Sequence, residues 1–472
     1  MKYTTMRRTM AAAGLVALYA GLSSAVCAQT APTTDEHVRE LERKLEQSLK
    51  RIDELSRKVE RLEAGGAPAA GTQAQPAPAA GTQAPPAPVA NTPAQPAAAA
   101  AQNQRIDELE SEVRQLSQSV SRVDTDTGVP LHGFANIDGR FFSRTDPSGD
   151  NVHSGVVEKA IEFYLTPNLG PRVKLLTEIA IETGEYSESV NIDMERLQIG
   201  YVQSDELTVW AGRFHTPYGY WNTAFHHGAQ IQTSIQRPKF LAFEDTYGMM
   251  PAHTVGFLAT GKKRLGDGRM TYDFAVGNSQ RILTSGGQPG TGQVDMNLLG
   301  SSNNSASVLF NLGYEFGSSL DGLKLGIDAM RWNATDDVAP LPNTTHMGFV
   351  GAYGAYTADD WEVLGEYYLF HDTNASGDGS SHSSSAYYLQ AGRTFGSFTP
   401  YTRWESAHLN QNDNYFAVLA PAIGSSYWRD VVGLRYDLTR STAFKFELNR
   451  TFYRDQRLPS YNELGTQVAV RF

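Results

Sequence analysis

The chain has 472 residues, with 40 Lys and Arg against 51 Asp and Glu, and a formal net charge of −11. This charge argues against general nucleic-acid binding, which depends on basic side chains that neutralise phosphates. No apolar run beyond the extreme N-terminus approaches the roughly 20 residues of a transmembrane helix, so a multi-span helical membrane protein is excluded. The single cysteine, Cys27, excludes a disulfide framework and a cysteine-based zinc site.

Residues 1–28 have the pattern of a secretory signal peptide. A positively charged start is followed by a short apolar segment and by small residues at the positions that precede a cut after Ala28. A lipoprotein anchor at Cys27 and a twin-arginine signal at Arg7-Arg8 are the alternatives. We therefore expect export, with no cysteine left in the mature chain, which suits the oxidising periplasm.

Two segments with heptad spacing follow, over 35–64 and 103–125, and both contain the sequence RIDEL. Apolar residues at steps of three and four with charges between them predict periplasmic α-helical coiled coils that associate with copies of themselves. The alternative is an amphipathic helix packed on a globular core. The Ala- and Pro-rich stretch 65–102 has too few large apolar residues for a core and predicts a disordered linker, suited to a reach toward the cell wall.

From residue 130 to 472 the pattern changes to alternating apolar and polar residues in segments that are separated by turns. Short turns follow the even-numbered segments, and mostly longer loops follow the odd-numbered ones, which is the asymmetry of an outer-membrane barrel. The predicted fold is all-β: a 16-stranded antiparallel transmembrane β-barrel preceded by the coiled-coil segments and the linker. The predicted strands are 131–143, 156–166, 171–183, 191–203, 207–214, 253–262, 268–278, 304–316, 322–333, 344–356, 360–371, 383–394, 397–409, 426–437, 441–453 and 464–472.

The two faces of the predicted strands differ in polarity. In 441–453, Phe444, Phe446 and Leu448 alternate with Lys445, Glu447 and Asn449. Because successive side chains of a strand point to opposite faces, one face is expected against lipid and the other in a wet lumen. The terminal Phe472 is typical of barrels that bacterial insertion machinery assembles. Aromatic residues near strand ends are predicted to form interfacial girdles: Trp210, Phe214, Trp361, Tyr367, Trp404 and Trp428.

The segment WAGRFHTPYGYWN (210–222) closes one strand and opens the longest loop. It is similar to the G-R-x-x-T-P-x-G stretch of the phosphate-selective porin (O/P-type) superfamily, in which DcaP-like porins also carry an N-terminal coiled coil. The resemblance implies a homotrimer of sixteen-stranded channels in the outer membrane that favour small anions such as phosphate or dicarboxylates. The chain departs from true phosphate channels because acidic residues outnumber basic ones in 130–472.

In barrels of this type the long loop after the fifth strand folds inward and narrows the pore. Here that loop is 215–252, and its aromatic content predicts packing against the barrel wall. Rings of fixed charge set ion selectivity, so its polar groups and the inward charges of the strands are the candidate channel-lining residues. Wall salt bridges that select nothing are the alternative. The loop candidates are His215, Tyr218, His226, His227, Arg237, Lys239, Glu244 and Asp245. The wall candidates are Asp138, Arg140, Lys174, Glu178, Arg196, Arg213, Lys324, Arg403, Glu405, Arg429 and Arg435.

The adjacent pair His226-His227 does not predict a metal site, because neighbouring strand residues point apart and no second ligand cluster accompanies them in the sequence. We expect no cofactor. An outer-membrane enzyme that uses Ser234 with His226 is a rival hypothesis, but no nucleophile motif surrounds them.

The predicted function is passive diffusion of small hydrophilic, anionic solutes. The alternative is a structural anchor that tethers the envelope through its coiled-coil arm. The predicted partners are outer-membrane lipid, further copies of the chain, small hydrophilic solutes and the cell wall, with no nucleic acid.

Overall fold

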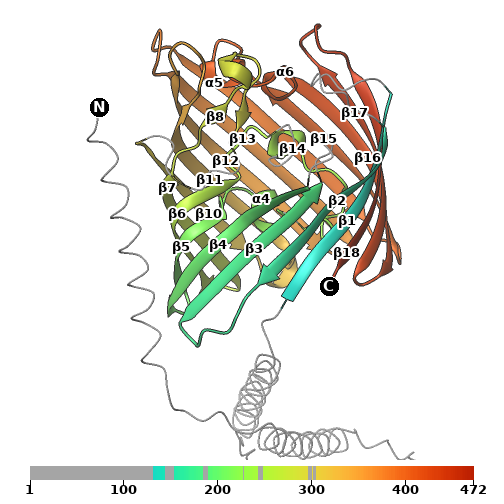
Figure 1. The fold of residues 1–472 in the computed structure, drawn as a ribbon. Coiled ribbons are helices and arrows are strands. Elements are labelled where there is room, and N and C mark those ends of the chain that lie inside the picture. The colour runs from blue at the N-terminus through green and yellow to red at the C-terminus, as the bar shows by residue number, and fades with distance from the viewer. Residues whose placement is uncertain are drawn as a thin grey trace, which may run out of the picture. The chain divides into compact units, whose positions relative to one another are not determined.

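The structure is a computed structural model that describes residues 131–143, 154–183, 190–226, 228–242, 248–295, 300 and 304–472. In the part that it describes, sixteen strands form one closed antiparallel barrel, and the strands are tilted as they run along its continuous wall (Figure 1). The signal peptide, both coiled coils and the linker predicted from the sequence lie outside the described residues.

The sixteen wall strands agree with the predicted ones to within a few residues at each end, so the prediction of the barrel is confirmed. The first eight are β1 Leu131–Phe142, β2 Gly155–Leu165, β3 Val173–Thr183, β4 Val190–Ser204, β5 Leu207–His215, β6 His253–Leu265, β7 Gly268–Asn278 and β10 Ala306–Glu315. The other eight are β11 Leu323–Thr335, β12 Thr344–Ala358, β13 Trp361–Asn374, β14 Ser381–Arg393, β15 Phe398–His408, β16 Tyr427–Thr439, β17 Thr442–Tyr453 and β18 Tyr461–Arg471.

Each wall strand pairs with its neighbours in chain order, and β1 closes the ring by pairing with β18. In that last ladder Phe134 lies opposite Arg471 and Asp138 opposite Gln467. Closure leaves no unpaired strand edge in the wall, which is the condition for a sheet to cross a bilayer.

Side chains on β17 separate by face as predicted. Phe446 and Leu448 leave 51% and 54% of their surface exposed, whereas Lys445, Glu447 and Asn449 are buried inside the ring. An outer face this apolar is expected to lie against lipid.

The connections after β7 and β15 lie at the end of the barrel opposite the start of β1 and the C-terminus (Figure 1). They carry the short strands β8 Ile282–Leu283 and β9 Gln293–Val294, which pair with each other, and the helices α5 Asn414–Val418 and α6 Pro421–Gly424. Among the described residues, no helix is long and apolar enough to cross a membrane.

The predicted aromatic girdle needs two corrections. Trp210 is half-buried and packs against the buried cluster around the loop between β5 and β6. Trp361, Tyr367, Trp404 and Trp428 are exposed on the outer face, as an interfacial position requires. Phe214 is instead only 1% exposed and belongs to the buried cluster around the loop between β5 and β6. The reason is its place one residue before the end of β5, where the chain turns toward the interior.

Candidate functional site

The loop between β5 and β6 packs against the inside of the wall, as its aromatic content predicted. It contains the short helix α4 Trp221–Ala224. Tyr218 and Trp221 are fully buried, and their rings meet Tyr368 and Tyr388 of the wall edge to face, with centroids 6.1 and 5.7 Å apart. Burial and the nearby carboxylate of Glu366 hold the pKa of the Tyr218 phenol well above its usual range, so it stays protonated.

The threonine of the G-R-x-x-T-P-x-G stretch fastens the two ends of this loop together. The backbone N–H of Thr216 donates to the carbonyl of Ala252 at 2.8 Å. Its hydroxyl lies 2.9 Å from that of Thr254, and its carbonyl accepts from the Asn222 side-chain amide at 2.6 Å. The loop therefore enters and leaves the wall at one narrow neck.

Gly219 brings the loop backbone onto the wall. Its φ is +61°, and its N–H donates to Asp328 Oδ2 at 2.8 Å. A Cβ at this position would lie 2.1 Å from Glu366 Oε2 and 2.2 Å from the Tyr368 hydroxyl. Only glycine fits, for reasons of both space and backbone conformation.

We therefore expect Gly219→Ala to destabilise the folded barrel by about 1–3 kcal/mol, measured by urea unfolding in lipid vesicles. Gly286→Ala is a matched control, because Gly286 has φ +64° with nothing within 4 Å of its Cβ position. The control carries the same backbone strain without the overlap and should lose about 1 kcal/mol. Equal losses in the two variants would contradict a tight fit of Gly219 on the wall.

Carboxylates on four separate strands accept loop backbone amides. Besides Asp328 of β11, Glu366 of β13 accepts from Trp221 N at 2.6 Å, and Glu405 of β15 accepts from Lys239 N at 2.6 Å. Glu447 of β17 accepts from Ile235 N at 3.0 Å. Each of these carboxyl groups accepts a backbone N–H at 3.0 Å or less, so the four positions hold the loop across the inside of the barrel.

Basic side chains of the wall bind the loop carbonyls in turn. Arg435 donates to the carbonyls of Gln230 and Gln232 at 2.6 and 2.9 Å. Lys445 donates to the carbonyl of Ser234 at 3.0 Å. Of the residues that anchor the loop, Asp328, Glu366, Glu447 and Lys445 were absent from the sequence-derived candidates. Their only signal is an isolated charge at an inward strand position.

Two predicted wall arginines form ion pairs in which the carboxylate is hidden. Arg196 pairs with Glu178, with 21% and 0% of the side chains exposed, and Arg140 pairs with Glu463, with 14% and 0% exposed. Arg435 pairs with Asp437 at 2.6 Å, and there the acid is the more exposed partner. In the first two pairs, the arginine side chain is therefore the partner that solvent inside the barrel can reach.

The remaining candidates occupy varied positions. Asp138 accepts from Asn136 and Gln467, Arg429 contacts Gln236 and Glu463, and Lys174 is exposed near the start of β3. In the loop, Arg237 donates to the His226 carbonyl, and Lys239 Nζ lies 5.7 Å from the ring centroids of both Tyr427 and Tyr453. Tyr218 and Lys239 thus contact the wall. His227, Glu244 and Asp245 lie outside the described residues. A role for any candidate in solute passage stays a prediction.

His226 does have companions, so the expectation that no second ligand cluster accompanies it is wrong. The ends of β5 and β6 bring His215 and His253 next to it. Its two ring nitrogens face Asn222 and His253, whereas the Ser234 hydroxyl donates to the carbonyl of Gln236. The serine and histidine of the hypothetical enzyme site are therefore engaged with other groups.

A cavity of about 520 Å³ lies where the short turns join the wall strands. Tyr220 of the loop borders it, together with Arg269, Glu315 and Lys324 of the wall. The loop thus reaches toward the short-turn end of the lumen, where charged side chains of both signs surround an open space.

No protein-family model matches the chain, and no curated protein matches it. Solved structures that are similar in fold include the outer membrane channel DcaP of Acinetobacter baumannii, with 10% identity, a TM-score of 0.49, and coverage of 73% of this chain and 97% of that chain. A loop L8 deletion mutant of OmpT, an outer membrane protein of Vibrio cholerae, has 10% identity, a TM-score of 0.48, and coverage of 73% and 99%. Salmonella typhi OmpF in complex with daunomycin has 12% identity, a TM-score of 0.44, and coverage of 73% and 97%.

Proposed function

We propose that the chain is an outer-membrane porin, a passive diffusion channel for small hydrophilic solutes. The observation that carries the proposal is a loop fastened by hydrogen bonds to wall carboxyl groups across the inside of a closed sixteen-stranded barrel with an apolar outer face. A sixteen-stranded barrel is wide enough for an aqueous channel, and an internal loop narrows it. Solutes then move down their own gradient.

We further propose that the channel prefers small anions such as phosphate or dicarboxylates. The support comes from the ion pairs Arg140–Glu463 and Arg196–Glu178. In both pairs the acidic side chain is fully buried, whereas part of the arginine side chain is exposed to solvent. Fixed charges that the solvent can reach set ion selectivity, so the excess of acidic residues in the sequence matters less than their burial. The proposed assembly is a homotrimer through the barrel and the coiled coil.

The test is single-channel conductance of the folded, full-length protein in a planar bilayer under a salt gradient. We expect current steps in groups of three and a reversal potential of the sign that anions give. The double variant Arg140→Gln, Arg196→Gln should move the reversal potential toward cations. Arg450→Gln, on the outer face of β17, should leave it unchanged. Inserted but silent protein would overturn the channel, and cation selectivity of the unaltered chain would overturn the anion preference.

A further inference from the structure

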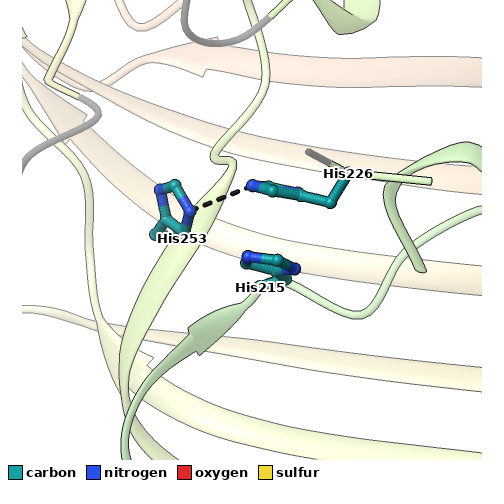
Figure 2. Close-up of side chains that lie close together, drawn as sticks. All are labelled: His215, His226 and His253. Atoms are coloured by element: carbon teal, nitrogen blue, oxygen red, sulfur yellow. Dashed lines mark hydrogen bonds between the residues drawn. The ribbon is translucent and has the colours of Figure 1, made fainter. Parts of the chain in front are cut away.

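Three histidines meet at the neck of the loop. His215 is the last residue of β5 and His253 the first of β6, and they lie opposite each other in the ladder between these strands. His226 comes from the loop, just after α4, and its ring stacks on that of His215 (Figure 2). The possible ligand nitrogens of the three rings all lie within 4.8 Å of one another.

The spacing of these nitrogens is close to that of a metal site. Zinc binds histidine nitrogen at about 2.0–2.1 Å, so two ligands of a tetrahedral site lie roughly 3.3 Å apart. His226 Nε2 and His253 Nε2 are already 3.1 Å apart, and both side chains are buried. The His215 ring now stacks on that of His226 at an interplanar angle of 15°, and a turn of this ring would bring in the third nitrogen ligand.

Carboxylate oxygens lie beside the same rings. Glu195 Oε2 is 2.9 Å from His253 Nε2, and Glu178 Oε2 is 3.2 Å from His215 Nε2. Glu195 is buried and comes from β4, the neighbour of β5. Three imidazoles with one carboxylate form a donor set that first-row divalent ions accept.

We propose that His215, His226 and His253, with the Glu195 carboxylate, bind one divalent transition-metal ion of the zinc type. Such an ion would join the loop to both strands from which it emerges. It would crosslink the two ends of the loop at the neck, in addition to the hydrogen bonds of Thr216 there.

The surroundings of His226 orient it for this role. Its Nδ1 lies 2.7 Å from Asn222 Oδ1, an atom that can only accept a hydrogen bond. The proton of a neutral ring therefore sits on Nδ1, and the lone pair of Nε2 is directed at His253. Metal-binding histidines commonly use such a carbonyl partner to fix their tautomer.

Arg213 opposes the binding of a cation. Its Nη2 lies 3.1 Å from His253 Nδ1 and 3.9 Å from Glu195 Oε2. A guanidinium stays charged in proteins, so it repels an incoming ion and competes for the carboxylate. The proposal therefore requires that loss of a histidine weakens metal binding and that loss of Arg213 strengthens it.

The experiment uses the full-length barrel in detergent, without a polyhistidine tag and stripped of metal by a chelator. Calorimetric titration with Zn²⁺ should give one ion per chain, and Co²⁺ should give the visible bands of a tetrahedral site. We expect His226→Ala to weaken Zn²⁺ binding at least roughly tenfold and Arg213→Gln to tighten it. His346→Ala removes an exposed histidine on β12 and should change nothing.

Absence of one-to-one binding by the unaltered protein would overturn the proposal. So would an equal Zn²⁺ affinity in the His226→Ala and His346→Ala variants, because adventitious surface binding predicts that result. If His226→Ala does not fold, the Co²⁺ spectrum of the unaltered chain and the Arg213→Gln titration decide. The readout is metal binding itself, so the result does not depend on whether the barrel conducts solutes.

Discussion

Replacing Arg403 by Met should lower the free energy of unfolding by about 3–5 kcal/mol, the cost of breaking a buried ion pair from one side. Arg403 and Glu405 are both fully buried, with Nε and Oε1 2.8 Å apart. The guanidinium also donates to Gln390 Oε1 and to the Ser234 hydroxyl, each at 3.0 Å. Met fills most of the same volume but removes the cation that is hydrogen-bonded to the buried Glu405 carboxylate.

The measurement is urea unfolding of the barrel in lipid vesicles, with Arg457→Met as the control. Arg457 also pairs with an acid, Asp455, at 2.7 Å, but 89% of its side chain is exposed. Exposed pairs contribute little to stability, so the control should unfold almost as the unaltered protein does. If the free energy of unfolding fell by the same amount in both variants, the Arg403–Glu405 pair would be as hydrated as a surface pair. The loop would then not exclude water from this pair.

The wall of the barrel could be predicted from the sequence because its signals are local. Phe446 and Leu448 against Lys445 and Glu447 form a period-two pattern that any strand with one lipid face must have. The alternation of short turns and long loops needs no knowledge of which strands pair. Closure through β1 and β18 then follows from an even number of antiparallel strands.

The contacts that hold the loop could not be predicted in the same way. Gly219 meets Asp328 and Trp221 meets Glu366 across more than a hundred residues of chain. Loop composition indicated that it packs, but not against which strands. Those partners depend on how far the loop reaches across the ring.

The histidine cluster was missed for a related reason. In the sequence-based prediction, His226 is considered together with His227, its neighbour in sequence. Its partners are instead the histidines at the two ends of the loop. His215 and His253 face each other only because of the register between β5 and β6. Histidines at both ends of one long loop are a signal that could have been read, since a loop whose ends share a neck brings them together.

Removing the Glu447 carboxylate should release part of the loop while the barrel stays folded. Glu447 Oε2 accepts from Ile235 N at 3.0 Å and from the Tyr401 hydroxyl at 2.7 Å. Hydrogen bonds to charged groups contribute about 1.5–3 kcal/mol, so in Glu447→Leu the opened state of this loop segment should be roughly 10–100 times more populated. Hydrogen exchange of peptides within 228–242 should accelerate by that factor.

The control is Asp430→Asn, which neutralises an exposed acid on the outer face of the adjacent strand β16 and should leave exchange of the loop unchanged. Peptides from β16 and β17 provide the second comparison, because their ladder bonds do not involve the Glu447 side chain. If the substitution accelerates hydrogen exchange in these strands as much as in the loop, Glu447 supports the barrel as a whole and the loop is not a separately docked unit. If hydrogen exchange accelerates only in the loop, docking of the loop is a local equilibrium set by the wall carboxylates. Single-channel current through Glu447→Leu should then be larger than through the unaltered protein, because a released loop obstructs less of the lumen.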